Sequence, residues 1–240
     1  MDFAEIFRRL REGLQLLAAW PLRWFAVSVL LFLIVEALAL LPVVGFSLKV
    51  VLTALFAGTV MRLFAAADRG EPPPVSGLFA IHRLGLGGGV ALAVSALLPF
   101  HAALALTAWL HGSGSVAFFF GSPLQMEPPP AVVFQNFKTA FYLFSVPFVF
   151  VAPAVALRHL GGWTALREAV TAAAAHWRAP VLLFLFSFAY ELLMARLPEF
   201  FPLAGVILVS VLVLTFYIAA MLAFTYVLGR HALGVRGSTD

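Results

Sequence analysis

The sequence predicts an all-α integral membrane protein: a bundle of six transmembrane helices with interfacial amphipathic helices on the cytoplasmic side. Hydrophobic residues make up 63% of its 240 residues and charged residues only 11%, whereas soluble domains hold about 45–50% and about 25%. This number of charged residues is too small to cover the surface of a soluble fold. Lipid must therefore cover most of the surface of this protein. Six stretches are also apolar and close to the roughly 20 residues that a helix needs to cross a bilayer core.

The six predicted spans alternate with polar connections along the chain. The fifth is the shortest, and we expect it to continue to Leu197. The strict alternation of a membrane barrel is missing, which favours helices. The spans are Trp24–Leu41, Val50–Ala67, Leu86–Leu110, Ala140–Leu157, Pro180–Leu193 and Leu203–Leu228.

Three segments have the composition of helices that lie on the membrane surface. The first, residues 1–21, repeats apolar side chains at helical spacing and places arginines on its other faces, as interfacial helices do. The second is Leu78–Leu84, and the third is Thr164–Trp177. In the first segment, the side chains predicted to anchor the chain to the membrane surface are Phe3, Phe7, Arg8, Arg9 and Arg11.

The order of these segments predicts a single membrane domain, 1–240, built from three units that each join a surface helix to a hairpin. Residues 1–21 precede a first hairpin at 22–77, a second hairpin covers 78–158, and residues 159–240 hold the third surface helix and hairpin. In the first and third units an acid precedes a proline, Glu36 before Pro42 and Glu191 before Pro198. This predicts a parallel repeat about an axis along the membrane normal.

The one long outer connection is predicted at residues 111–138. It contains the apolar run Val116–Phe120 between glycine-containing turns, and Pro128–Pro130 stiffens its return. The three phenylalanines of this run either anchor the loop in the outer interface or cover the mouth of the bundle.

The distribution of Lys and Arg predicts the orientation. With cytoplasmic termini, twelve basic residues fall on the inside and only Lys49, Lys138 and Arg196 on the outside, which is the usual positive-inside bias. We therefore expect a bacterial inner-membrane protein with both termini in the cytoplasm. The net charge of +4 follows from the same bias, so the expected partners are membrane lipids, other membrane proteins or a second copy, and not nucleic acid.

Motifs of catalysis and metal binding are missing from the sequence. The chain has no cysteine, and it lacks the zinc, serine-hydrolase and phosphate-loop signatures. Five of the six histidines stand alone at span boundaries, and no two share the i, i+4 spacing of a helical metal site. We therefore expect no enzyme, no catalytic residue, no metal and no cofactor.

Ionisable groups inside the spans are costly and mark candidate sites. Glu36, His101 and Glu191 fall in the outer halves of their spans, with Arg62 and Arg196 as candidate counter-charges. The three side chains could form a polar site that binds a ligand or passes protons. In the other interpretation they are structural: Glu36 accepts a hydrogen bond from a neighbouring helix, and Glu191 pairs with Arg196.

One stretch resembles a known family. The run Ala67-Asp68-Arg69-Gly70-Glu71-Pro72 is followed by Leu78-Phe79-Ala80, and the third unit leads through Trp177 to Pro180. These motifs are similar to those of a YciC-like group of uncharacterised bacterial polytopic inner-membrane proteins. The resemblance implies a six-helix inner-membrane protein without an assigned reaction, and it transfers no catalytic residue.

Two functions are compatible with these observations. The first is an accessory, assembly or envelope-homeostasis component that acts through helix and lipid contacts. The second is a small proton-coupled transporter or channel-like protein with a polar site at Glu36, His101 and Glu191. A polar, water-accessible cavity that reaches Glu36 and Glu191 would favour transport, whereas a lipid-tight core would favour the accessory role.

Overall fold

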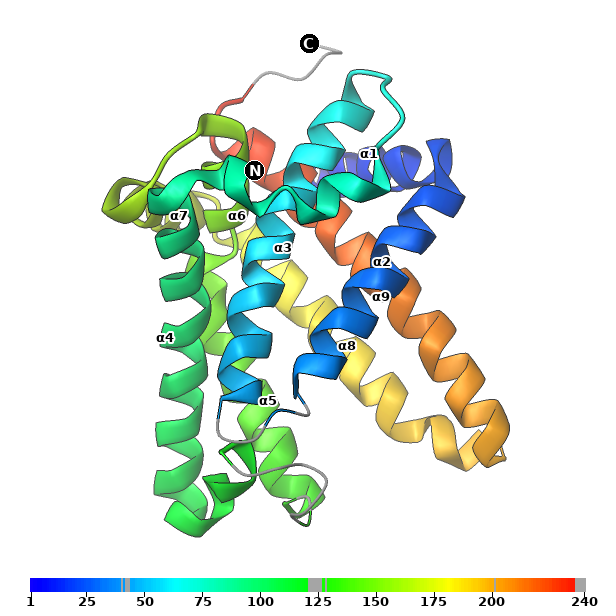
Figure 1. The fold of residues 1–240 in the computed structure, drawn as a ribbon, viewed down its shortest axis with the longest axis vertical. Helices are drawn as coiled ribbons and strands as arrows, with labels where there is room; N and C mark the ends of the chain where they lie inside the picture. The colour runs from blue at the N-terminus through cyan, green and yellow to red at the C-terminus, as the bar shows by residue number, and fades with distance from the viewer. Residues whose placement is uncertain (40, 42–43, 121–126, 128, 201, 236–240) are drawn as a thin grey trace.

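The computed structural model describes residues 1–39, 41, 44–120, 127, 129–200 and 202–235. All regular secondary structure in these residues is helical (Figure 1), which confirms the predicted all-α fold. The α-helices are α1 (Phe3–Ala19), α2 (Pro21–Ala39), α3 (Gly45–Asp68), α4 (Gly85–His111), α5 (Ala131–Ser145), α6 (Val151–Arg158), α7 (Gly162–Ala175), α8 (Arg178–Phe200) and α9 (Leu203–Ala232). The short 3₁₀ helices are η1 (Val75–Phe79), η2 (Ile81–Leu84), η3 (Ser113–Phe119) and η4 (Val146–Phe148).

Within the described residues, six helical stretches are long and apolar enough to cross a membrane, so this is a membrane protein. The fourth combines α5, η4 and α6. Pro147 interrupts the α-helix at η4, but the three elements together form one span. The stretches are Pro21–Leu38, Gly45–Asp68, Ile81–His111, Ala131–Arg158, Arg178–Leu197 and Val209–Ala232.

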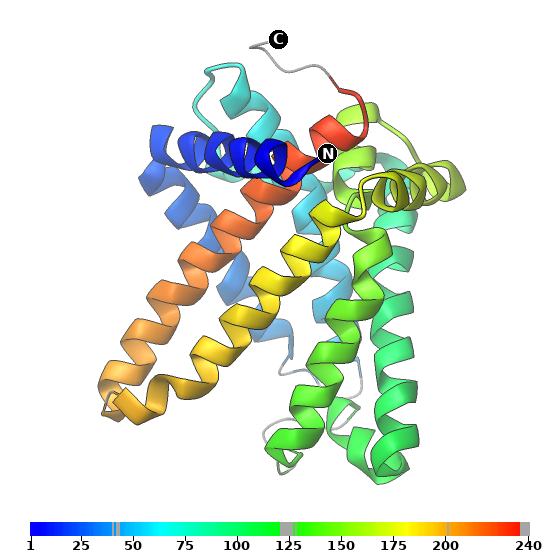
Figure 2. The ribbon, with the colours of Figure 1, turned by 180° about the vertical axis from the view of Figure 1, so that it is seen from behind.

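Helix α3 is the centre of the bundle and packs against α2, α4, α6 and α9. The start of α1 and the end of α9 lie at the same end of the molecule, which we call the terminal end (Figures 1 and 2). At the opposite end, the α8–α9 hairpin diverges from the α4–α5 pair (Figure 2). The bundle is therefore closed at the terminal end and splayed at the other.

Helices α1 and α7 lie across the terminal end, over the ends of the spans (Figures 1 and 2). Asp2 starts α1 by accepting a hydrogen bond from the Glu5 amide at 2.8 Å. Pro21 starts α2, at the position in a helix where its missing N–H costs nothing. The second surface segment differs from the predicted Leu78–Leu84 helix, because it forms the two 3₁₀ turns η1 and η2.

The apolar face of α1 is divided between two environments. Ile6, Leu10 and Leu17 are buried, and α1 packs on α9. Phe3 and Phe7 are more than half exposed, so they remain available to lipid as predicted. Arg9 is not a surface anchor, since its side chain is only 13% exposed and bonds to the carboxylate of Glu12.

The fourth span begins earlier than predicted. Helix α5 starts at Ala131, nine residues before the expected Ala140, so the predicted outer connection 111–138 ends at Pro130. Lys138 thus lies inside a span and not in a loop. The polar residues Gln135, Asn136 and Lys138 lowered the local hydropathy and concealed the first half of the helix.

The described part of the predicted outer connection includes η3, which packs against the bundle. Phe119 of η3 is only 2% exposed, and it packs against Phe100 of α4 and Phe137 of α5. Phe46, at the start of α3, also contacts Phe119, with ring centroids 5.3 Å apart. This aromatic cluster covers the splayed end between α3, α4 and α5, so Phe119 covers the mouth of the bundle, while Phe120 stays 44% exposed.

Candidate functional site

The first intramembrane acid forms an ion pair between neighbouring helices. Glu36 of α2 accepts a hydrogen bond from Lys49 Nζ of α3 at 2.6 Å. Both side chains remain partly exposed, Glu36 by 45% and Lys49 by 28%. The pair lies near the point where the chain turns from α2 into α3, so it closes the first hairpin at the end opposite the terminal end.

The second acid is more deeply enclosed. Glu191 of α8 accepts hydrogen bonds from Lys138 Nζ at 2.6 Å and from the Tyr142 hydroxyl at 3.0 Å, both on α5. Its side chain is only 10% exposed. Nearby, Tyr217 of α9 donates to Ser187 at 2.8 Å and stacks on Tyr190 with ring centroids 4.0 Å apart. This polar group joins α5 to the diverging α8–α9 hairpin.

The structure does not gather the predicted site residues into one site. Glu36 pairs with Lys49, Glu191 with Lys138, and Nδ1 of His101 lies 2.8 Å from the carbonyl oxygen of Leu97 on its own helix. Among the described residues, none of these three side chains bonds to another. His101 therefore bonds within its own helix, and the carbonyl that Pro99 leaves without its usual donor is that of Ser95, four residues before the proline, and not that of Leu97.

The predicted counter-charges also lie elsewhere. Glu191 and Arg196 are five residues apart on one helix, which turns their side chains about 140° from each other, and Glu191 takes its cation from α5 instead. Arg62 lies 13 residues along α3 from Lys49, or about 20 Å. There its Nη1 donates to the Arg83 carbonyl at 3.0 Å. Arg196 is exposed on α8.

A groove of about 410 Å³ lies at the centre of the spans, between α3, α4, the α5–α6 span and α9. Small and apolar side chains line most of it, including Ala57, Ala96, Ala152 and Leu222. Lys49 lines it too, but its ammonium is paired with Glu36. We call this cavity the central groove. Its volume is in the range of pockets that hold small molecules.

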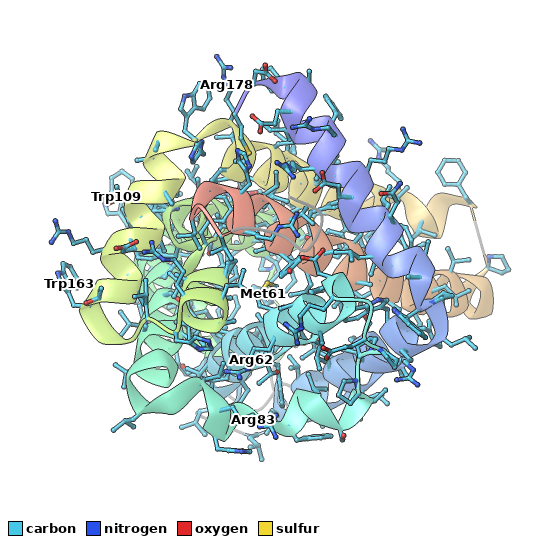
Figure 3. The ribbon with its side chains drawn as sticks, turned by 90° about the horizontal axis from the view of Figure 1, so that it is seen from above. Met61, Arg62, Arg83, Trp109, Trp163 and Arg178 are labelled. Atoms are coloured by element: carbon cyan, nitrogen blue, oxygen red, sulfur yellow. The ribbon has the colours of Figure 1, made fainter. Side chains whose placement is uncertain are left out.

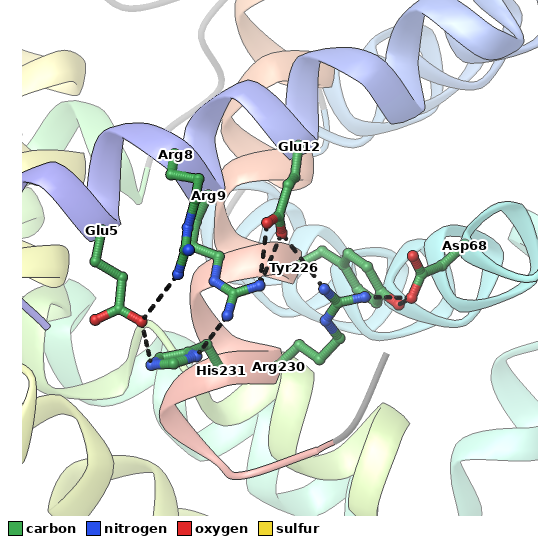
Figure 4. Close-up of polar contacts among 8 residues, drawn as sticks. All are labelled: Glu5, Arg8, Arg9, Glu12, Asp68, Tyr226, Arg230 and His231. Carbon is green, nitrogen blue, oxygen red and sulfur yellow. Dashed lines mark hydrogen bonds and ion pairs between the residues drawn. The ribbon is translucent and has the colours of Figure 1, made fainter. Parts of the chain in front are cut away.

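At the terminal end, a charged network ties α1, α3 and α9 together (Figure 4). The Arg230 guanidinium bonds to Asp68 and reaches Glu12 at 3.4 Å. Tyr226 donates to the same Asp68 at 3.0 Å. The side chain of Arg230 is only 5% exposed, so its charge depends on these carboxylates. Sequence reasoning missed this network, because its members looked like ordinary boundary charges.

A second part of the network involves histidines. Nε2 of His231 lies 3.0 Å from the Glu5 carboxylate, and Nδ1 lies 3.2 Å from a guanidinium nitrogen of Arg9 (Figure 4). The ring of His176, at the end of α7, lies 6.1 Å from the ring of His231. Burial, with smaller repulsions from the amino-terminal ammonium of Met1 and from His231, holds the pKa of His176 below its ordinary 6.5.

In the part of the chain that the structure describes, no three His, Asp or Glu side chains are grouped as metal ligands would be. The arrangement instead offers an apolar groove in the spans, two ion pairs between helices, of which only that of Glu191 is enclosed, and a charged terminal end. Comparison of the chain with protein-family models, curated proteins and solved structures finds no match.

Proposed function

We propose that this protein is a non-enzymatic accessory component of the cytoplasmic membrane, with both termini inside, and that it acts by holding a lipid chain in the central groove. The groove itself supports the proposal most directly, because four helical spans border it and mostly small apolar side chains line it. An acyl chain matches such a lining, whereas a hydrated ion would lose its water there without compensation.

The ion pairs support this proposal. A carboxylate that carries protons or binds a cation must be able to change partners. Glu191 is instead held by a lysine and a tyrosine, and Glu36 by a lysine. Their bonds are directed between helices, so they stabilise the frame around the groove. The resemblance to the YciC-like group, which has no assigned reaction, agrees with a role without catalysis.

A matched pair of substitutions on α4 tests the proposal. Ala96 lines the central groove, whereas Ala105 is exposed on the outside of the same helix. Ala96→Phe fills part of the groove, and Ala105→Phe adds the same ring where it faces lipid. We expect the wild type and Ala105→Phe to retain lipid through purification in detergent, and Ala96→Phe to lose it. Native mass spectrometry counts the bound lipid directly.

The outcome that would contradict the proposal is equal lipid retention in all three proteins. Thermal unfolding in the same detergent shows whether Ala96→Phe remains folded. If that variant unfolds, Ala96→Leu provides a smaller obstruction and should reduce lipid retention in part.

Transport remains the second candidate, because one observation favours it. The polar side chains of Lys138, Tyr142 and Glu191, with Ser187 and Tyr217 close by, form a group within the spans that extends over α5, α8 and α9. A transporter would use this group to move protons. Proton uptake into liposomes that is lost in Glu191→Gln would favour transport over lipid binding.

A further inference from the structure

A second cavity lies at the terminal end, on the same three helical elements that form much of the central groove. Its volume is about 480 Å³, and α3, the α6 region and α9 line it. On each of these elements, residues that line this cavity lie about one helical turn beyond residues that line the groove. Ala65 follows Met61, Ala156 follows Ala152, and Arg230 follows Thr225. We call this cavity the arginine pocket, because Arg62, Arg69 and Arg230 line it together with Asp68, Tyr226 and His159.

Two of the three arginines that line the arginine pocket are paired with carboxylates of the described residues, and the third is not. Arg230 bonds to Asp68 and Glu12, and Arg69 bonds to Glu71. Among the described residues, no carboxylate lies within ion-pair distance of Arg62, whose guanidinium donates to the carbonyl oxygen of Arg83. The pocket therefore offers one guanidinium whose charge is not neutralised by the protein. Figure 3 looks down on this end, with Arg62 and Arg83 labelled.

A guanidinium is the side chain best suited to a phosphate, because its N–H groups match two phosphate oxygens in one plane. Basic pockets between membrane helices on the cytoplasmic side are a known arrangement for binding acidic headgroups. Arg9 shares Glu12 with Arg230, so four arginines (Arg9, Arg62, Arg69 and Arg230) face three carboxylates (Glu12, Asp68 and Glu71). The one excess positive charge matches the single negative charge of a phosphodiester. A phosphomonoester would bring up to two charges close to Asp68, which the pocket does not compensate.

We propose that the arginine pocket binds a phosphodiester anion, with Arg62 as its main ligand. Two sources carry this group: the headgroup of an anionic phospholipid and a soluble glycerophosphodiester. Binding of a phospholipid rests on the proposed function, because a phospholipid whose headgroup lies in the arginine pocket would extend its acyl chains toward the central groove. Recognition of the phosphodiester itself does not depend on the groove.

The test compares two lipids and one soluble probe on the purified full chain in neutral detergent. Phosphatidylglycerol carries one phosphodiester, diacylglycerol has the same chains without a phosphate, and glycerophosphoglycerol is the headgroup of the first without chains. We expect the wild type to bind phosphatidylglycerol about tenfold more tightly than diacylglycerol, the difference expected for one charge-assisted contact. Native mass spectrometry during titration gives each affinity.

Arg62→Gln should abolish this preference, whereas Arg83→Gln should keep it within twofold. Arg83→Gln is the matched control, because it removes a nearby exposed arginine and keeps the backbone carbonyl to which Arg62 donates. Ala65→Phe, which fills the arginine pocket without changing charge, should also abolish the preference. It serves as the second variant if Arg62→Gln unfolds.

Binding of glycerophosphoglycerol, lost in Arg62→Gln, would identify a soluble source. Binding of phosphatidylglycerol alone would identify the lipid. Equal affinities for phosphatidylglycerol and diacylglycerol would overturn the proposal, because the phosphodiester would then contribute nothing to binding. Equal losses in Arg62→Gln and Arg83→Gln would also overturn it, because the attraction would then come from the surface in general. If the central groove holds no acyl chain but the arginine pocket binds the headgroup, Ala96→Phe should leave the headgroup preference unchanged. That outcome would contradict the proposed function and leave the phosphodiester proposal standing.

Discussion

The two intramembrane carboxylates have the same kind of partner but different surroundings. Glu36 and Glu191 each accept a hydrogen bond from a lysine ammonium at 2.6 Å. Glu36 keeps 45% of its side chain exposed and joins consecutive helices of one hairpin, whereas Glu191 keeps 10% and joins two different hairpins. Tyr142 adds a third group only at Glu191. Sequence spacing made the two acids look equivalent, yet only one is an enclosed connection between hairpins.

This difference in enclosure determines what each pair contributes. An ion pair that remains exposed contributes little, about 0–1 kcal/mol. Breaking an enclosed pair leaves an uncompensated charge and costs about 3–5 kcal/mol. We therefore expect the Glu191 pair to hold the splayed α8–α9 hairpin against α5, and the Glu36 pair to contribute little beyond the hairpin itself.

The largest effect is expected from removing the lysines. Lys138→Met leaves Glu191 enclosed without a cation and should lower the free energy of unfolding by about 3–5 kcal/mol. Lys49→Met, the matched change at Glu36, should cost about 1 kcal/mol or less. Unfolding in mixed micelles measures both. The double variant Lys138→Met/Glu191→Leu should recover most of the loss, and no recovery would show that Lys138 acts mainly through packing.

A smaller difference is expected from removing the acids. Glu191→Gln keeps the size of the side chain but weakens two hydrogen bonds to a charged acceptor, at about 1.5–3 kcal/mol. Glu36→Gln should change the free energy of unfolding by about 1 kcal/mol or less. Equal destabilisation by the two glutamine variants would remove the distinction between the pairs.

Tyr142→Phe tests the group that only the enclosed pair has. The substitution removes one hydroxyl that donates to Glu191 at 3.0 Å, so we expect a loss of about 0.5–1.5 kcal/mol. Phe141→Leu is a suitable control, because it changes the neighbouring ring without touching the carboxylate. The prediction fails if Tyr142→Phe is as stable as the wild type.

The smallest effect concerns pH, at the terminal end and outside the spans. Burial holds the pKa of His176 below its ordinary value of 6.5, so the folded protein favours the neutral ring. Protonation therefore opposes folding, and stability should fall as the pH drops below about 6.5. His176→Gln should show a flatter profile of thermal stability between pH 7.5 and 5. A steeper profile would contradict this assignment.

Hydropathy predicted the spans well, because each span needs a long apolar stretch wherever its neighbours lie. It failed at Ala131–Lys138, where a lysine is tolerated inside a span since its partner Glu191 is supplied by a helix 53 residues away. The same reason hid the bond between Asp68 and Arg230, which are 162 residues apart. A single sequence shows that a charge is costly, but it does not show which distant side chain compensates it.

The phenylalanines of the outer connection gave a similar ambiguity. Val116–Phe120 suited either the outer interface or the mouth of the bundle, because both environments accept aromatic rings. The choice depended on Phe100 and Phe137, which present rings to Phe119 at the splayed end. Composition cannot distinguish these surroundings, since they differ only in the helices that lie beside the loop.

The central claim is that the ion pairs hold the helices while the central groove between them holds a lipid chain. Photo-crosslinking with a phospholipid that carries a diazirine on its acyl chain tests it most directly, in bilayers, with the adducts mapped by mass spectrometry. The account predicts adducts at groove residues such as Ala57, Ala96 and Ala152, which Ala96→Phe removes. Adducts confined to outward-facing residues such as Leu98 and Trp109, unchanged in Ala96→Phe, would contradict it.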